Sequence, residues 1–161
     1  MFTGAACPQT LAQEKGMLTK VVTEFLEKQI PERIERIEAG EEPAPFIRIR
    51  SENGEFGDIE LYDDGDEVTI VFGRFTHSHY SNYDDIPLEQ KEDQIAEDVF
   101  DVITDTLNDK LEFWGSHEGS GGGQDAEWAA AKKRGLLSRI LNRGSSRTYY
   151  RWSGATRKTR S

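Results

Sequence analysis

Three histidines are the residues of this sequence best suited to holding a transition metal. His77 and His79 alternate on one predicted strand, so both point to the same face, and His117 follows a later strand. Imidazoles are common zinc ligands, and a catalytic zinc site uses three protein ligands. If the two strands were neighbours, the three rings would converge on one ion, with Asp84 or Asp85 as further ligands. Polar residues are also common on the wet face of a sheet, so the sequence does not require this site.

A row of carboxylates is the second candidate for binding. Residues 87–109 have the apolar spacing of an amphipathic helix, and acidic residues occupy the opposite side. Like charges four residues apart each cost an isolated helix roughly 0.2 to 0.5 kcal/mol, so the row is locally unfavourable. It could attract a basic partner or serve solubility alone. Two predicted partner-binding residues, Tyr80 and Tyr83, come before the helix. The others lie on the helix and are here called the acidic row: Asp93, Glu97, Asp98, Asp101, Asp105 and Asp109.

Other familiar catalytic and cofactor motifs are missing. There is no G-x-S-x-G nucleophile elbow, and Cys7 has no obvious histidine partner. The glycine run at 119–123 has neither the Lys-Ser/Thr of a Walker motif nor the spacing of a dinucleotide fingerprint. The acidic run at 63–67 lacks the spacing of a calcium loop. We therefore expect no catalytic residues and no cofactor, a linker at 119–123 and a hairpin turn at 63–67.

Charge is divided sharply along the chain. The formal net charge is −10, yet residues 128–161 contain ten basic residues and no acidic one. Basic segments of this kind can grip phosphates, lie on anionic lipid or dock on an acidic surface. Here the acidic surface could belong to the same chain. The aromatic residues between Arg147 and Trp152 could also stack on nucleobases, although the acidic remainder of the chain would repel a polyanion.

The elements that position these residues follow from hydrophobic periodicity. A capping box at 10–13 and apolar residues from Leu18 to Ile30 predict a first helix, which restarts at Pro31 and closes at Gly40. The period then changes to 2, which predicts strands at 46–50, 58–62 and 68–72. The third strand continues toward Tyr80 with a bulge at Gly73.

The second half of the chain completes an α+β prediction. After the helix at 87–109 we expect a strand at 111–114, a third helix at 128–141 and a fifth strand at 147–152. The order α-β-β-β-α-β-α-β favours a mostly antiparallel sheet of about five strands with about three helices packed on it. We expect one domain over residues 1–154, frayed at 1–9, with 155–161 as a basic disordered tail. The alternative is a domain that ends near Gly119 and carries a loose basic tail.

Composition predicts a small cytoplasmic protein. The 161 residues include eight Phe, five Tyr and three Trp, enough large apolar side chains for one packed core. A single cysteine excludes an internal disulfide and fits a reducing compartment. Residues 1–16 lack the pattern of a signal peptide, and no apolar run has the length of a membrane span.

These observations lead to one functional hypothesis and two alternatives. The leading hypothesis is a non-enzymatic interaction module whose acidic surface binds a basic protein partner. In composition the chain resembles small acidic inhibitor and immunity-type proteins that neutralise basic toxins, a likeness that no motif carries. The first alternative is a metal-binding protein or metal-dependent enzyme that uses His77, His79 and His117. The second is attachment to nucleic acid or membrane through the basic C-terminal segment. Self-association between the acidic and basic surfaces would be a further use of the charge division.

Overall fold

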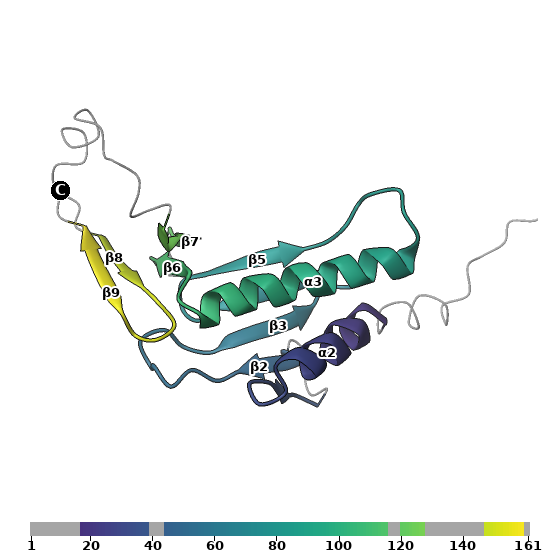
Figure 1. Ribbon diagram of the computed structural model, residues 1–161, viewed down its shortest axis with the longest axis horizontal. Helices are drawn as coiled ribbons and strands as arrows, with labels where there is room; N and C mark the ends of the chain where they lie inside the picture. The colour runs from purple at the N-terminus through teal and green to yellow at the C-terminus, as the bar shows by residue number, and fades with distance from the viewer. Residues whose placement is uncertain (1–16, 39–43, 116–119, 128–146, 160–161) are drawn as a thin grey trace, which may run out of the picture. The chain divides into compact units, whose positions relative to one another are not determined.

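The computed structural model describes residues 17–38, 44–115, 120–127 and 147–159 (Figure 1). Several expectations lie outside these residues: the frayed start, the capping box, the close of the first helix at Gly40, His117 and the third helix at 128–141. Two long helices are described, α2 (Met17–Gln29) and α3 (Leu88–Leu107). Among the described residues, no helix is both long and apolar enough to span a bilayer.

The strands form two antiparallel sheets, so the α+β prediction is confirmed at the level of class. The first sheet has the order β1 (Glu35–Arg36), β2 (Ile47–Ile49), β3 (Ile59–Asp63), β4 (Val68–Phe72) and β5 (Thr76–Tyr80). The second sheet has the order β7 (Gly122–Asp125), β6 (Leu111–Trp114), β8 (Arg147–Tyr150) and β9 (Thr156–Thr159). The expected single sheet of about five strands is therefore wrong in number and in grouping.

The chain after Pro31 is not helical. Proline has no N–H to donate, and α2 ends at Gln29, shortly before it. Residues 35 and 36 instead form β1, which pairs antiparallel with β2. The guanidinium of Arg36 hydrogen-bonds both carboxylate oxygens of Glu27 on α2, which fixes β1 beside the helix.

Two glycine segments differ from expectation for a steric reason. Gly73 separates β4 from β5, because its φ of +50° turns the chain where one long bulged strand was expected. The glycine run is a strand over Gly122–Asp125 rather than a linker. Gly122 and Gly123 lie against the rings of Trp114 and Phe113 on β6, where a Cβ would approach within 2.8 and 2.9 Å of ring carbons.

Thr156–Thr159 was expected to belong to a disordered tail, and this prediction is wrong because these residues form β9. The strand pairs with β8 along its whole length, from Arg147 opposite Thr159 to Tyr150 opposite Thr156. Main-chain pairing and a partner for Arg157, described below, supply the stabilisation that the basic composition alone did not reveal.

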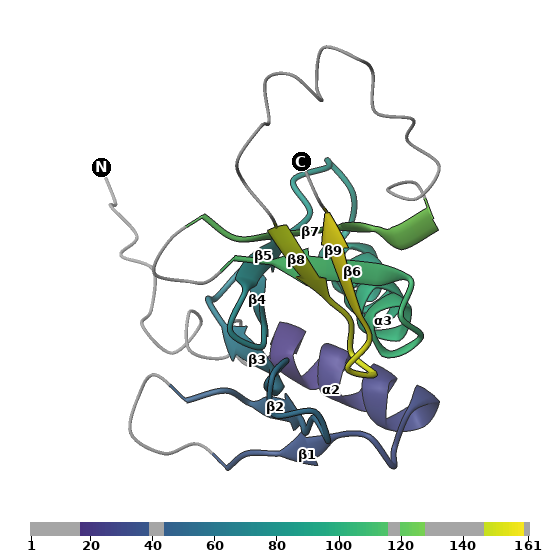
Figure 2. The same cartoon turned by 90° about the vertical axis from the view of Figure 1, so that its left-hand side faces the viewer.

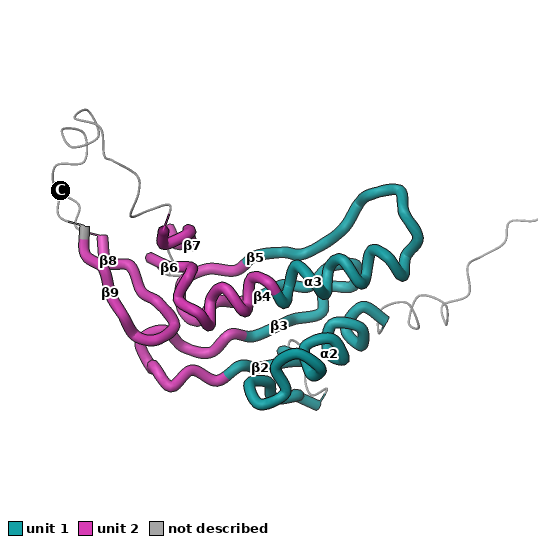
Figure 3. Tube along the Cα trace, in the orientation of Figure 1, with its two compact units in different colours: residues 1–49, 60–70, 78–100 teal, residues 50–59, 71–77, 101–161 magenta. Residues whose placement is uncertain are grey.

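Two compact units divide the described chain (Figure 3). Unit 1 comprises residues 1–49, 60–70 and 78–100, and unit 2 comprises residues 50–59, 71–77 and 101–161. The prediction of a single domain over residues 1–154 stays a prediction.

Unit 1 has an aliphatic core between helices and sheet. α2 and the part of α3 in this unit lie on the same face of the sheet (Figures 1 and 2). Phe25 of α2 meets Phe100 of α3 edge-on, with ring centroids 5.8 Å apart. The buried apolar side chains of the unit are Leu18, Val22, Leu26, Ile47, Ile49, Leu61, Val68, Ile70, Ile95, Ala96 and Val99.

Unit 2 has an aromatic core. The ring of Phe56 lies between 5.3 and 5.4 Å from the centroids of Phe75, Phe113 and Trp152, and Phe113 also stacks on Phe72. Such ring pairs contribute beyond the area that they bury. The backbone carbonyl of Phe56 accepts a hydrogen bond from the N–H of Arg74 at 3.2 Å, which brings Gly73 against residue 56.

Replacement of Gly73 with alanine should destabilise the protein by about 2 to 4 kcal/mol, since the left-handed conformation and the crowding both act against a side chain. A Cβ at Gly73 would lie 1.8 Å from the carbonyl oxygen of Phe56. Gly54→Ala is the matched control, because nothing lies within 4 Å of a Cβ there. Urea unfolding of both variants measures the difference, and equal stabilities would contradict this account of the turn.

Candidate functional site

The loops at one end of unit 1 enclose a pocket of about 560 Å³. Its walls come from the start of α2, the turn between β3 and β4, the loop after β5 and the first two turns of α3. The lining residues are Leu18, Asp64, Gly65, Asp66, Asn82, Tyr83, Leu88, Lys91, Glu92 and Ile95.

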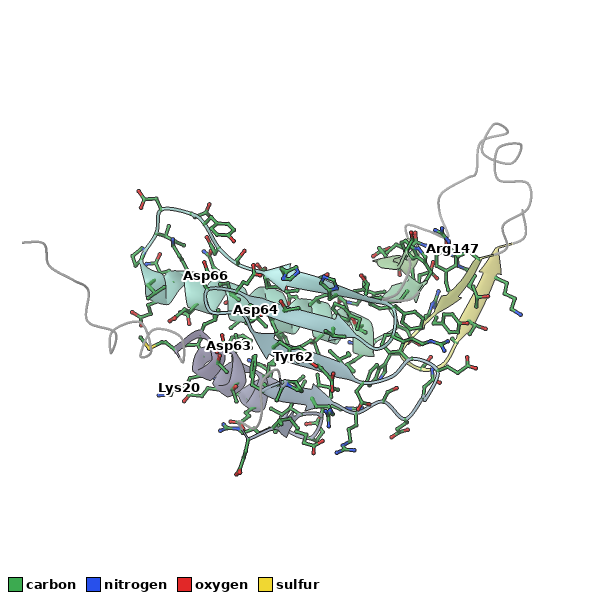
Figure 4. The ribbon with its side chains drawn as sticks, turned by 180° about the vertical axis from the view of Figure 1, so that it is seen from behind. Lys20, Tyr62, Asp63, Asp64, Asp66 and Arg147 are labelled. Atoms are coloured by element: carbon green, nitrogen blue, oxygen red, sulfur yellow. The ribbon has the colours of Figure 1, made fainter. Side chains whose placement is uncertain are left out.

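Hydrogen bonds hold the two loops of this pocket in place. The carboxylate of Asp63 accepts hydrogen bonds from the Thr19 hydroxyl of α2 at 2.9 Å and from the N–H of Gly65 at 2.8 Å. Asp63, Asp64 and Asp66 lie close together at the turn (Figure 4). In the other loop, the Asn82 amide hydrogen-bonds Gln94 of α3. The pocket is therefore preformed rather than left to loose loops.

Exposed apolar side chains gather at the same pocket. Among the described residues, the exposed large hydrophobics are Met17 at 50%, Tyr83 at 80% and Leu88 at 53%. Tyr83 and Leu88 line the pocket, and Met17 directly precedes the lining residue Leu18. Single exposed apolar residues are ordinary, but a group of them around a concave site is typical of a binding surface.

Glu92 is a buried carboxyl in this pocket. Its exposure is only 6%, and no described residue forms a hydrogen bond or ion pair with it. Burial raises the pKa of the Glu92 carboxyl, and the negative charges of Asp93 and Glu89 raise it further. A buried carboxylate without a partner is unfavourable, so this side chain is disposed to hold a proton or to take a cation.

Unit 2 contains a buried glutamate with the opposite environment. Glu112 of β6 is fully buried, yet Arg157 of β9 bonds both of its oxygens, and the Gln124 amide of β7 donates to it at 2.7 Å. The guanidinium of Arg151 lies 3.8 Å away. Burial alone would raise the pKa of Glu112, but these donors and positive charges outweigh it and lower the pKa. The Glu112 carboxylate therefore forms a buried ion pair with Arg157 that stabilises the fold.

A polar cluster shares Asp64 with the lining of the pocket. Asp64, Glu67 and His79 place one ligand atom each within 4.8 Å of one another. His79 Nδ1 lies 3.0 Å from the Glu67 carboxylate and 2.8 Å from the Thr69 hydroxyl, which also bonds Asp64. One imidazole and two carboxylates are a ligand set that zinc accepts. The imidazole and the two carboxylates already have these contacts as partners.

The predicted trio of histidines is reorganised by the structure. His79 joins Asp64 and Glu67, two acids of the β3–β4 turn that were not expected as ligands. His77 lies outside this group, as do Asp84 and Asp85, and His117 lies outside the described residues. The acidic turn and the histidine twelve residues after Glu67 were visible in the sequence. Its meaning depended on β4 pairing with β5, which the expected single long strand excluded.

The acidic row divides into exposed and structural members. In unit 1, Asp93, Glu97 and Asp98 are exposed and form no ion pair with a described residue. Asp101 of unit 2 has the same character. The proposed role in docking does not extend to the last two members, because both have local partners.

Asp105 and Asp109 act at the end of α3. The Asp105 carboxylate pairs with the Lys110 ammonium at 2.7 Å, and its carbonyl accepts the N–H of Lys110 at 2.9 Å. Asp109 has a φ of 59° and terminates the helix in the left-handed conformation, and its side chain accepts the N–H of Ser153 at 2.9 Å. This geometry is that of a helix C-cap.

The two predicted tyrosines have different surroundings. Tyr83 is exposed at the rim of the pocket, whereas Tyr80 of β5 is half-buried. Burial first, and then the negative charge of Asp98, raises the pKa of Tyr80 to about 12, although a hydrogen bond with Ser78 acts in the opposite direction. Tyr80 therefore stays a neutral phenol beside the acidic row, and Tyr83 is the better placed of the two to meet a partner.

Glu92 is the residue that the sequence reasoning missed. A signal for it existed, because position 92 lies four residues before Ala96 and seven before Val99, on the apolar side of the helix. An acid on a buried face is rare unless it has a partner or a function.

Comparisons with protein-family models, curated proteins and solved structures found no match to this chain.

Glu92→Gln should stabilise the protein at neutral pH by on the order of 1 to 2 kcal/mol, because it removes a charge that burial disfavours. The folded-state pKa of Glu92 is raised, so its contribution to stability is complete below about pH 4.3, the unfolded value, and is lost as pH rises through the folded value. The gain from Glu92→Gln should therefore shrink in acid.

Urea unfolding from pH 4 to 8 measures the effect of Glu92→Gln. Glu112→Gln, measured in the same way, provides the opposite control. The pKa of Glu112 is lowered, so its contribution is present above the unfolded value and lost as pH falls through the folded one. This variant should lose about 3 to 5 kcal/mol at neutral pH, because it breaks a buried ion pair by removing one partner. Equal effects of the two substitutions at neutral pH would contradict the contrast between them.

Proposed function

We propose that this protein is a non-enzymatic interaction module that binds a basic protein partner through the acidic surface of unit 1. The observation that carries the proposal is that unit 1 presents both unpaired carboxylates and exposed apolar side chains. Asp93, Glu97 and Asp98 of the acidic row are exposed on α3, and Tyr83 and Leu88 are exposed at the pocket of the same unit.

The two kinds of side chain supply different parts of an interaction. Exposed carboxylates steer a positively charged protein toward the surface and raise its association rate, but they contribute little affinity when solvated. Apolar residues that lose contact with water supply affinity at the centre of an interface. A surface with only one of these properties would support the proposal less well.

Two arginines described in unit 2 are paired within the fold, which weakens the alternative of nucleic-acid or membrane attachment through the basic segment. Arg151 and Arg157 are both directed to Glu112, and the Arg147 guanidinium lies 5.3 Å from the centroid of the Trp114 ring. Trp152, considered as a stacking residue, packs edge-on against Phe56 in the core. Arg151, Arg157 and Trp152 are therefore engaged within the fold and are not free to contact a polyanion, whereas Arg147 and Lys158 are exposed.

The test is a charge reversal on α3. A photoreactive amino acid at the exposed position of Gln90 should capture a basic protein in the source cells, to be identified with its contact peptide by mass spectrometry. In Asp93→Lys/Glu97→Lys/Asp98→Lys, the association rate constant with that purified partner should fall by about tenfold or more at low salt. Raised ionic strength should slow association of the unaltered protein in the same direction.

The matched control reverses three other exposed acids, Glu38, Glu52 and Glu55, and produces the same change in net charge. It should retain most of the association rate, because these acids lie outside α3. A captured partner of acidic composition, or equal losses in the two triple variants, would overturn the proposal.

A second candidate function is binding of a divalent transition metal at Asp64, Glu67 and His79. The observation in its favour is the convergence of one imidazole and two carboxylates within 4.8 Å. A bound ion would replace the hydrogen bonds that now join His79 to Thr69 and Glu67, so the metal must compensate for their loss.

On this second reading, zinc added to metal-free protein should raise the unfolding temperature, as a ligand that binds only the folded state does. The rise should disappear in His79→Asn and persist in His77→Asn, which alters the other histidine of β5. An absence of any zinc-dependent rise, or an equal rise in His79→Asn, would exclude a metal function for this cluster.

A further inference from the structure

We propose that the pocket of unit 1 receives an arginine side chain of the basic partner, with Glu92 as the carboxylate that pairs with its guanidinium. This inference rests on the proposed function and names the chemistry of its central contact. Three properties of the pocket lead to it: an unpartnered acid, an apolar wall and a negatively charged rim.

The acid determines the sign of the ligand. Glu92 is 6% exposed, lines the pocket and lacks a partner among the described residues. The other buried glutamate among the described residues, Glu112, is bonded by Arg157 and approached by Arg151. Glu92 has the burial of Glu112 without the guanidinium, so an arginine from outside would complete the same kind of ion pair.

The wall suits the alkyl part of a long basic side chain. Leu18 and Ile95 are 4% exposed each, and Leu88 is half-exposed at the entrance. Arginine buries its methylene stem against apolar surface while its charged head reaches a polar group. The aromatic ring of Tyr83, exposed at the rim, offers a face on which a guanidinium can stack during entry.

The rim supplies attraction. Asp64 and Asp66 line the pocket from the β3–β4 turn, where Figure 4 places them close together. Lys91 is the basic residue among the lining side chains, against three acids. It neighbours Glu92 in sequence, but adjacent residues on a helix point about 100° apart, and the two form no ion pair.

Arginine fits this site better than lysine for two reasons. Its planar guanidinium can bond both oxygens of one carboxylate, as Arg157 does to Glu112. It is also more weakly hydrated than an ammonium, so less solvation is lost when it enters a site as enclosed as that of Glu92.

The experiment titrates the full-length protein with N-acetyl-arginine methylamide and follows its amide resonances by NMR. The expected result is saturable shifts at residues around the pocket, such as Gly65, Tyr83 and Lys91. N-acetyl-citrulline methylamide has the same shape without the charge and should bind about tenfold more weakly or worse, because the charge-assisted bond is lost.

Variants assign the binding to Glu92. Glu92→Gln should weaken the arginine derivative about tenfold, whereas Glu55→Gln removes an equal charge at an exposed site and should leave binding unchanged. Lys91→Gln should strengthen binding about twofold, since it removes a competing positive charge. N-acetyl-glutamate methylamide should not bind.

Several results would overturn the inference. The first is an absence of saturable binding of the arginine derivative to the unaltered protein. That result would overturn the inference whether the pocket holds a second copy of the chain, basic residues of the same chain, or no occupant. The second is equal binding of the arginine and citrulline derivatives, or no loss in Glu92→Gln. The third is binding of the glutamate derivative that Lys91→Gln abolishes, which would assign the pocket to an anion.

These outcomes are separate from those of the proposed function. If the charge reversal on α3 abolishes partner binding while Glu92→Gln has no effect on binding of the arginine derivative, the proposed acidic surface is supported and the proposed arginine pocket is wrong. If the arginine derivative binds as expected while the charge reversal on α3 leaves partner association unchanged, the proposed arginine pocket is supported and the proposed acidic surface is wrong.

Discussion

The cost of placing a carboxylate out of contact with water is the constraint on which the described structure depends. The effective penalty is several kcal/mol per ion, and a partner with good geometry must offset it. Unit 2 meets this constraint at Glu112, where strands β6, β7 and β9 each supply one member of the network. The pairing explains why residues after Gly154 form a strand: β9 carries the guanidinium that the buried acid needs.

Unit 1 does not meet the constraint from within. Glu92 occupies a position on the apolar side of α3 and lines the pocket with the buried residues Leu18 and Ile95. Burial raises its pKa, and the charges of Asp93 and Glu89 raise it further. Natural chains retain such residues at functional sites, where local stability is given up for binding. In this interpretation the acidic row increases the rate of encounter, and the pocket determines what kind of side chain is bound.

Periodicity in the sequence was enough to predict α+β class, the span of α3 and the strands from Ile47 to Phe72, because each buries one regular face. It failed where glycine acts through packing. The conformation of Gly73, and the contacts of Gly122 and Gly123 with aromatic rings, depend on residues far away in the chain. β9 was missed for the same reason, since its stabilising partner Glu112 is 45 residues from Arg157.

The candidate site was predictable in its charges and not in its shape. The acidic row and Tyr83 were recognisable from residue types, but the partners of Asp105 and Asp109 depend on how α3 ends and where Ser153 lies. The cluster around His79 required the pairing of β4 with β5. Glu92 could have been recognised from its place on the helical wheel, yet its lack of a partner is a property of the folded unit alone.

The measurement that tests the central claim most directly is a ¹³C NMR titration of the Glu92 side-chain carboxyl, with and without N-acetyl-arginine methylamide. The account predicts that in the free protein its pKa lies above the ordinary value of a glutamate, because burial favours the protonated form. Saturation with the arginine derivative should lower that pKa, because the guanidinium favours the carboxylate. A midpoint at the ordinary value of a glutamate, unchanged by the arginine derivative, would contradict the claim that Glu92 is a buried acid that can pair with a cation.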